Sequence, residues 1–156
     1  LLESENLHVA MWGTPPASVA VWDQTSRDAM DLLARPDYMV GSDSLHVGRW
    51  PHPRAYGTFP RVLGRLRRRY GTLSLAQIVQ RITDNPAGRF GLDRRGRIQS
   101  GFFADIVVFD PNTIMDNATY DDPCQPPSGI SFVLVNGEVA VNQGLCTGIM
   151  AGQAIP

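Results

Sequence analysis

The first part of the chain contains two short apolar runs, and between them apolar residues recur at helical spacing. Residues 7–11 and 38–40 are apolar runs that predict strands. Between them a helix is predicted from Thr25 or Ser26, which are good N-cap residues, to Arg35. A strand, a helix and a second strand in this order form a βαβ unit, and its apolar strands indicate a parallel sheet covered on both faces.

Two further helices are predicted downstream. Apolar residues recur at helical spacing from Phe59 to Tyr70, and arginines fill most of the remaining positions. Ser74 and Gln77 form a capping box in front of a second apolar stripe, which marks the start of the next helix. Pro86 either ends that helix or begins a short extra turn.

Beyond residue 93 the pattern changes to β-branched runs separated by turn residues. Residues 105–109 predict one strand. Residues 131–135 and 138–141 flank the dipeptide at 136–137, Asn-Gly, which strongly favours a tight hairpin turn. The tail from residue 144 is rich in glycine and alanine and either adds an edge strand or stays irregular. The second part of the chain is therefore predicted to be mostly β.

We place a domain boundary near residue 93. Residues 1–93 form the α/β part, and residues 94–156 form a small mostly-β domain. The 156 residues suffice for one ordinary core or for pieces of two smaller ones. The chain opens on Leu1 without a methionine and soon enters an apolar segment. Either a disordered leader has been trimmed, or the chain is the tail of a longer polypeptide, and we favour the tail.

Composition narrows the range of partners and compartments. The formal net charge of −1 gives no overall attraction to nucleic acid or anionic lipid. The sequence contains neither an apolar run of membrane-spanning length nor a signal-peptide pattern at its start. Cys124 and Cys146 are too few for a disulfide framework, so we interpret them as free thiols in a reducing cytoplasm, with a single bridge as the alternative.

All fourteen Lys and Arg residues of the chain are arginines, and four of them form one dense cluster, Arg65 to Arg69, interrupted only by Leu66. Such a cluster binds nucleic acid phosphate in some proteins. Its alternative is a solvated helix face whose apolar stripe points inward. We favour the solvated face, because no aromatic side chains alternate with the arginines and the net charge is not basic.

The strongest chemical candidate follows the apolar run at 38–40. That run ends in Gly41, Ser42 and the carboxylate Asp43. A carboxylate just past a barrel strand points into the mouth of the barrel, where it can transfer a proton or bind a cation. The alternative is that Asp43 only caps the following turn.

The loop that follows adds two imidazoles and a guanidinium. His46 and His52 could bind zinc, but their spacing from Asp43 matches no compact zinc motif, and structural roles are favoured for both. Arg54 presents a rigid fork that suits the carboxylate of a substrate. A surface ion pair is the alternative role for Arg54.

Five segments together resemble the amidohydrolase superfamily, and specifically the N-acyl-D-amino-acid deacylases, or D-aminoacylases. Three of them are more specific to the deacylases: MVGSD at 39–43, HPR at 52–54 and GTFPRVLG at 57–64. The other two resemble the segment where many amidohydrolases leave the barrel and enter a small β-domain. They are NPAGRFGL at 85–92 and GRIQSGFFADIVVFD at 96–110.

This resemblance implies a metal-dependent (β/α)8, or TIM, barrel with a small β-sandwich domain, of which this chain would hold the last βα units and most of the β-domain. It implies that Asp43 is the general base toward water and then the acid toward the leaving amine, and that it is a possible metal ligand. Arg54 would bind the α-carboxylate of the substrate, and His52 and Ser42 would be supporting residues. The histidine and cysteine ligands of the family's zinc centre match no motif of this sequence.

We therefore expect the C-terminal fragment of a zinc-dependent enzyme that hydrolyses N-acyl-D-amino acids to a carboxylate and a D-amino acid. The fragment alone is expected to be inactive and to associate with the missing N-terminal part of the barrel or with itself. No nucleic acid or membrane partner is expected, and the location is cytoplasmic. The alternatives are a fragment of a cyclic amidase of the hydantoinase or dihydropyrimidinase type, or a non-catalytic interaction module.

Overall fold

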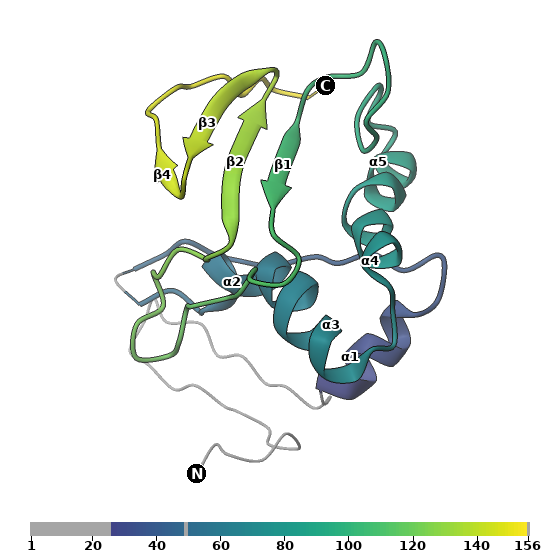
Figure 1. The fold of residues 1–156 in the computed structure, drawn as a ribbon, viewed down its shortest axis with the longest axis vertical. Coiled ribbons are helices and arrows are strands. Elements are labelled where there is room, and N and C mark those ends of the chain that lie inside the picture. The colour runs from purple at the N-terminus through teal and green to yellow at the C-terminus, as the bar shows by residue number, and fades with distance from the viewer. Residues whose placement is uncertain (1–25, 49, 156) are drawn as a thin grey trace.

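The computed structural model describes residues 26–48 and 50–155, and its helices precede its strands along the chain (Figure 1). The helical elements are α1 (Ser26–Leu33), α2 (Arg54–Arg61), the π-helical turn η1 (Val62–Leu66), α3 (Arg67–Tyr70), α4 (Leu75–Ile82) and α5 (Asp84–Phe90). The strands are β1 (Ile106–Phe109), β2 (Ile130–Val135), β3 (Glu138–Asn142) and β4 (Leu145–Cys146). The sheet lies above the helical segment that begins with α2, while α4 and α5 lie beside β1.

α2, η1 and α3 follow one another without a break and form the longest helical segment of the described chain. This segment begins at Arg54, earlier than the predicted start at Phe59. The prediction was wrong there because the apolar repeat begins later than the first turn, which is closed by the Ala55 amide donating to the His52 carbonyl at 2.9 Å. Pro60 lies inside α2 and has no amide proton for an α-helical bond, and the wider π turn follows directly after it.

The helix boundaries follow local sequence signals. Gly71 ends α3 with φ of 62°, a left-handed conformation that glycine adopts without strain. The capping box at α4 is present: the Gln77 amide donates to the Ser74 side chain at 3.3 Å, and the Ser74 amide donates to the Gln77 side chain at 2.9 Å. Pro86 lies in the first turn of α5, where its missing amide proton is not needed. Of the two predicted outcomes for Pro86, the extra helical turn is therefore the one found.

The four strands form one antiparallel sheet in the order β1-β2-β3-β4. The predicted hairpin is confirmed, since β2 and β3 are joined by Asn136 and Gly137, with φ of 49° and 88°. Positive φ at both turn residues matches the right-handed twist of the strands. Of the two outcomes predicted for the tail, the edge strand is found in the short strand β4, and the residues described after it are irregular.

The predicted strand at 38–40 is wrong, because these residues form no strand in the structure. A strand needs a neighbouring strand to receive its hydrogen bonds. Here the amide of Val40 instead donates to the carbonyl of Arg81 at 3.4 Å. The other predicted strand of the βαβ unit, at 7–11, lies outside the described residues. The described chain holds a single sheet, so the β-sandwich and the boundary at residue 93 stay predictions.

The hydrophobic core joins the helices to the loop that follows β1. Met30 of α1, Ile78 of α4 and Ile114 of the loop are the most completely buried large side chains described, each at most 1% exposed. Phe109 and Ile130, at the ends of β1 and β2, pack against the same cluster. The remaining buried members of the cluster are Leu33, Val62, Leu63, Leu66 and Leu73.

Two glycines allow the backbone at Ile114 to come very close. A Cβ added at Gly64 of η1 would lie 2.1 Å from the carbonyl oxygen of Ile114. A Cβ added at Gly129 would lie 2.5 Å from the Ile114 amide nitrogen, and the φ of Gly129 is 80°. The neighbours in both cases are backbone atoms, which cannot rotate away. Glycine at these positions therefore sets how closely the helix and the loop can approach.

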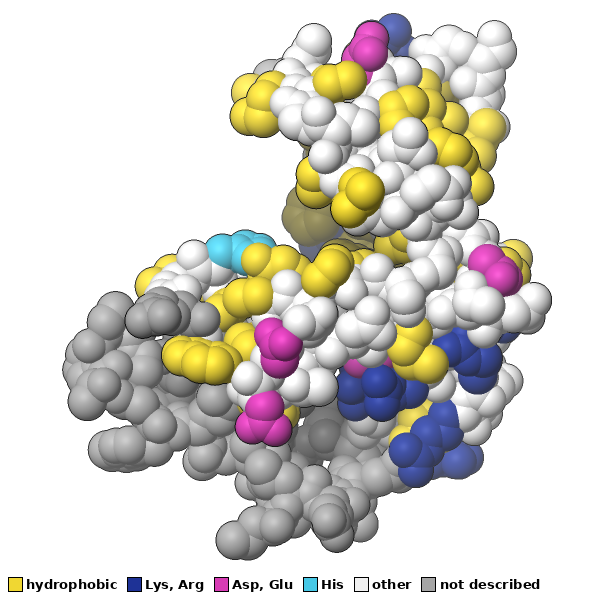
Figure 2. Space-filling view, turned by 60° about the vertical axis from the view of Figure 1, so that its left-hand side comes forward, with side chains coloured by type: hydrophobic (Ala, Val, Ile, Leu, Met, Phe, Trp, Pro, Cys, Tyr) yellow, Lys and Arg dark blue, Asp and Glu magenta, His cyan; other side chains and the backbone are white. Residues whose placement is uncertain are grey.

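Both cysteines described are free and exposed, as predicted, and no helix in the described ranges has the length and apolar character needed to cross a bilayer. Large apolar side chains remain exposed on the sheet, among them Val107, Val108 and Leu145. Figure 2 shows an indentation between the sheet above and the helical part below, with hydrophobic side chains along it. Single exposed apolar side chains are common on protein surfaces and identify no partner by themselves.

The Gly64→Ala substitution should lower the free energy of unfolding of the full-length protein by about 1–3 kcal/mol, because the added methyl group overlaps the Ile114 carbonyl. Gly88→Ala in α5 is the matched control: nothing lies within 4 Å of its added Cβ, so the gain in helix propensity should stabilise the protein by roughly 0.5–1 kcal/mol. Chemical denaturation measures both. Equal effects of the two substitutions would contradict the close approach at Gly64.

Candidate active site

Asp43 and Arg54 meet at the start of α2. Nη2 of Arg54 lies 3.1 Å from Oδ2 of Asp43, and the two side chains are 21% and 88% exposed. Arg54 is the first residue of α2, while Asp43 has φ of 46°, a left-handed conformation that aspartate tolerates better than most residues. The structure thus brings together the two residues that the sequence singles out, with the guanidinium as the better-buried partner.

The guanidinium of Arg54 retains an unused donor. Its Nε is buried and has no hydrogen-bond partner among the residues that the structure describes. A buried donor without a partner costs about 1–3 kcal/mol, so such groups are rare unless a ligand or water supplies the acceptor. A planar guanidinium suits a carboxylate, which can accept two parallel hydrogen bonds. Arg54 therefore has the chemistry of an anion-binding group.

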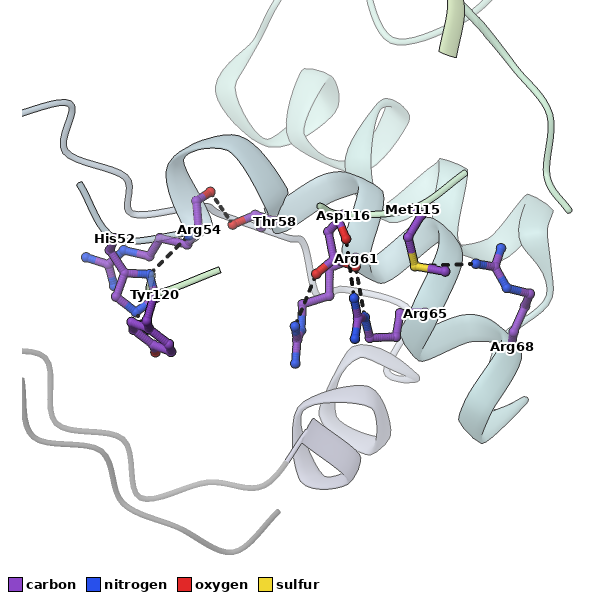
Figure 3. Close-up of polar contacts among 9 residues, drawn as sticks. All are labelled: His52, Arg54, Thr58, Arg61, Arg65, Arg68, Met115, Asp116 and Tyr120. Atoms are coloured by element: carbon purple, nitrogen blue, oxygen red, sulfur yellow. Dashed lines mark hydrogen bonds and ion pairs between the residues drawn. The ribbon is translucent and has the colours of Figure 1, made fainter. Parts of the chain in front are cut away.

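His52 lies beside Arg54 and contacts it through the backbone (Figure 3). The Arg54 amide donates to Nδ1 of His52 at 3.0 Å. On the other side of the ring, Nε2 lies 3.1 Å from the hydroxyl oxygen of Tyr120, and the two rings meet edge to face. Burial, followed by the charge of Arg54, lowers the pKa of His52 below its ordinary value of 6.5, and burial raises the pKa of Tyr120. His52 is thus held as a neutral ring next to the candidate anion site.

The other candidates of this loop, His46 and Ser42, have contacts of their own. The ring of His46 meets that of Tyr56 edge to face, with centroids 5.7 Å apart. The hydroxyl of Ser42 donates to that of Ser44 at 3.1 Å. Among residues 26–48 and 50–155, no group of three or more His, Cys, Asp and Glu side chains could hold a metal ion. The described residues therefore do not form a zinc site by themselves, and Asp43 offers a single carboxylate.

Arg61 and members of the arginine cluster bind the protein's own chain. Nη1 of Arg61 and Nε of Arg65 donate to the two carboxylate oxygens of Asp116 at 3.2 and 3.0 Å. Asp116 is only 4% exposed, whereas the two arginine side chains are half-exposed. Two guanidinium groups thus compensate one buried carboxylate in the loop between β1 and β2 (Figure 3).

The next two arginines bind backbone carbonyls of the same loop. Arg67 donates to the Pro111 carbonyl of the loop and, at 2.8 Å, to the Leu63 carbonyl of its own helical segment. Arg68 donates to the carbonyl of Ile114 at 2.9 Å and to that of Pro111 at 3.3 Å. Basic side chains accordingly gather on one side of the helical part in Figure 2. The predicted solvated helix face is found, since Arg65, Arg68 and Arg69 are exposed and the apolar stripe of Val62, Leu63 and Leu66 is buried. The prediction did not include the hydrogen bonds to the loop, whose acceptors lie within reach because of the close approach at Gly64.

Sequence reasoning missed Asp116 and Tyr120. The many arginines of the segment formed by α2, η1 and α3 called for an acidic partner, but Asp121 and Asp122 were equally good candidates by sequence. Tyr120 lies in a loop without a periodic pattern, so no local signal connects it to His52.

A model of the amidohydrolase family matches residues 14–141. The chain belongs to the amidohydrolase family. D-aminoacylase of Alcaligenes xylosoxydans xylosoxydans is 42% identical over 140 residues, which are 90% of this chain and 29% of that protein. N-acyl-D-glutamate deacylase of the same organism is 43% identical over 122 residues, which are 78% of this chain and 25% of that protein.

Solved structures agree with this family assignment. A crystal structure of a D-aminoacylase superposes with a TM-score of 0.79 at 41% identity, covering 85% of this chain and 28% of that one. N-acyl-D-glutamate deacylase from Bordetella bronchiseptica, solved with zinc and a phosphonate that mimics the tetrahedral intermediate, gives 0.77 at 43% identity, covering 83% and 27%. The amidohydrolase chain described here thus spans less than a third of the length of these relatives.

We expect the Asp116→Asn substitution to lower the free energy of unfolding of the full-length amidohydrolase by about 1.5–3 kcal/mol. The substitution removes the negative charge of the carboxylate that accepts hydrogen bonds from Arg61 and Arg65. Asp121→Asn makes the same chemical change at an exposed position of the same loop and should stay within about 0.5 kcal/mol of wild type. Urea denaturation of both variants decides. A similar loss in both would show that the two arginines do not depend on Asp116.

Nuclear magnetic resonance of the His52 ring should show the proton on Nε2 and a pKa below 6.5. Since the folded-state pKa is lowered, the stabilising contribution of neutral His52 is present above pH 6.5 and is lost as the pH falls through the folded-state pKa. The difference in unfolding free energy between wild type and His52→Asn should therefore shrink as the pH is lowered below 6.5. A His52 proton on Nδ1, or a pKa above 6.5, would contradict the hydrogen bonds described.

Proposed function

We propose that this amidohydrolase chain contributes Asp43 and Arg54 to the active site of a deacylase that hydrolyses N-acyl-D-amino acids to a carboxylate and a D-amino acid. The observation that carries the proposal is the Asp43–Arg54 pair with its buried, unpartnered Nε. Relatives at 42% and 43% identity named D-aminoacylase and N-acyl-D-glutamate deacylase support the substrate class. Because the chain spans less than a third of their length, the remaining active-site groups would come from residues that the structure does not describe.

The two side chains divide the chemistry. Arg54 binds the α-carboxylate of the substrate and so orients the scissile amide, which converts part of the binding free energy into positioning. Asp43 accepts a proton from the attacking water as the new C–O bond forms. It then gives that proton to the leaving nitrogen as the C–N bond breaks, so that the carboxylate is regenerated.

The barrel and the metal belong to the same proposal. In it, Asp43 lies at the mouth of a (β/α)8 barrel whose strands come from the part of the enzyme outside the described residues. Zinc is the cofactor, as in the zinc-containing relative from Bordetella bronchiseptica, with its ligands outside the described residues. The remainder of the barrel, or a second copy of the chain, would cover the exposed apolar side chains, and a cytoplasmic location stays a prediction.

The geometry favours a linear substrate over a cyclic one. An N-acyl amino acid carries a free carboxylate that the unused donor of Arg54 can bind, whereas a hydantoin or a dihydropyrimidine ring carries none at that position. The alternative of a non-catalytic interaction module used the arginine cluster as its binding surface. Three arginines of that cluster, Arg65, Arg67 and Arg68, donate to the loop between β1 and β2, and these contacts count against that alternative.

Asp43→Asn in the full-length protein should lower kcat for N-acetyl-D-amino acids by roughly 10²–10⁴-fold, because the amide cannot accept the proton of the water. Arg54→Lys should instead raise KM by about tenfold or more, because lysine keeps the charge but loses the planar fork. Steady-state kinetics on a panel of N-acetyl-D-amino acids, with their L-enantiomers and with hydantoins, measures both effects and the substrate class.

The matched controls are Asp31→Asn and Arg27→Lys, which alter an exposed ion pair in α1 and should leave kcat and KM unchanged. Full activity of the Asp43→Asn variant would refute its assignment as the proton-transferring group. Turnover of hydantoins in preference to N-acetyl-D-amino acids by wild type would replace the proposed substrate class with the cyclic one.

A further inference from the structure

Tyr120 and His52 connect two distant parts of the chain next to the candidate anion site. They are 68 positions apart, and the hydroxyl oxygen of Tyr120 lies 3.1 Å from Nε2 of His52. The ring centroids are 5.3 Å apart at an interplanar angle of 82°, so an edge-to-face ring contact accompanies the hydrogen bond. Figure 3 shows Tyr120 placed against His52 at the end of α2 that carries Arg54.

The hydrogen bonds determine which ring nitrogen of His52 carries the proton. Nδ1 accepts from the Arg54 amide, so the proton of the neutral ring is on Nε2 and is donated to the Tyr120 hydroxyl oxygen. A protonated ring would turn a donor toward the Arg54 amide and break this arrangement. Burial and the nearby Arg54 charge favour the neutral ring. The His52 ring therefore bridges the Tyr120 hydroxyl and the Arg54 backbone amide through two hydrogen bonds.

Tyr120 is anchored on its own side by the loop between β1 and β2. The Thr119 amide donates to the Asp122 carbonyl, and the Asp122 amide donates to the Thr119 hydroxyl, both at 3.0 Å. At the base of the loop, Met115 and Ser128 exchange two backbone hydrogen bonds. Asp116 fastens the same loop to the helical segment. The Tyr120 hydroxyl is therefore a fixed point and not the end of a loose loop.

We propose that Tyr120, acting through His52, is a positioning residue that fixes the first turn of α2 and thereby aims the Arg54 guanidinium at the carboxylate of the substrate. The inference rests on the proposed function, in which Arg54 binds that carboxylate. A bidentate contact requires placement within about 0.5 Å, which a side chain on the first residue of a helix attains only if that turn is held. Tyr120 then contributes to selectivity for a free carboxylate without touching the substrate.

The test compares Tyr120→Phe with wild type in the full-length protein, using the best N-acetyl-D-amino acid of the panel and its primary carboxamide. Phenylalanine keeps the ring contact and removes only the hydroxyl. The ratio of kcat/KM for the acid to that for the carboxamide should fall about three- to tenfold, the equivalent of one hydrogen bond, through a higher KM for the acid. Tyr38→Phe makes the same change at a tyrosine whose ring packs against the guanidinium of Arg35, and it should leave the ratio unchanged.

A second variant separates the Tyr120 contact from the helix cap. In His52→Asn, the side-chain oxygen takes the place of Nδ1 and can accept from the Arg54 amide, while the contact with Tyr120 is lost. This variant should reproduce the change in ratio seen in Tyr120→Phe, and the double variant should add nothing further, because both substitutions break the same connection. Nuclear magnetic resonance of Tyr120→Phe should also show an altered Nε2 resonance of His52.

Each outcome of these measurements either supports or overturns the positioning role of Tyr120. A lower acid-to-carboxamide ratio in both single variants, without additivity, supports the inference. Equal losses for acid and carboxamide in Tyr120→Phe, or kinetics identical to wild type, overturn it while leaving the proposed function intact. Wild-type protein that hydrolyses no member of the panel overturns the proposed function, and the inference falls with it.

Discussion

The carboxylate of Asp116 is the contact on which the arrangement of helix and loop depends. It is almost fully buried, and a buried charge is strongly unfavourable unless opposite charges and hydrogen bonds compensate it. Arg61 and Arg65 supply both from one face of the helix. A lateral shift of the loop would leave the carboxylate buried without these partners. The electrostatic requirement of one side chain thus determines where the whole loop lies.

Steric conditions make this contact possible. Arg61, Arg65 and Arg68 recur at spacings of four and three residues and therefore share one face of the helix, toward which the loop lies. The loop comes within reach only because Gly64 presents no Cβ to the Ile114 carbonyl. That carbonyl then accepts from Arg68 at 2.9 Å. Close packing at Gly64 thus accompanies the compensation of the buried charge of Asp116 in the same contact between helix and loop.

Local signals in the sequence predicted the helices, the hairpin and the edge strand, because each depends on residues near one another in the chain. The capping box at Ser74 and the turn at Asn136 are of this kind. The strand at 38–40 failed because strand formation depends on a partner strand and not on apolar character alone. The candidate pair Asp43 and Arg54 was found from residue type and resemblance. Tyr120 and Asp116 could not be found, since their partners are determined by tertiary packing across the chain.

Arg54 can bind a ligand although it already has an ion-pair partner, because the free energies of the two contacts differ. Asp43 is 88% exposed, and an ion pair with so exposed a carboxylate contributes only about 0–1 kcal/mol. The buried Nε without an acceptor costs about 1–3 kcal/mol, so a bound carboxylate that satisfies it gains more than the pair with Asp43 provides. Arg54 is also the fixed member of the pair, because the first turn of α2 and His52 hold its backbone. A ligand carboxylate can therefore share or replace Asp43 at the guanidinium, and Asp43 is then available for the proton transfer that we propose for it.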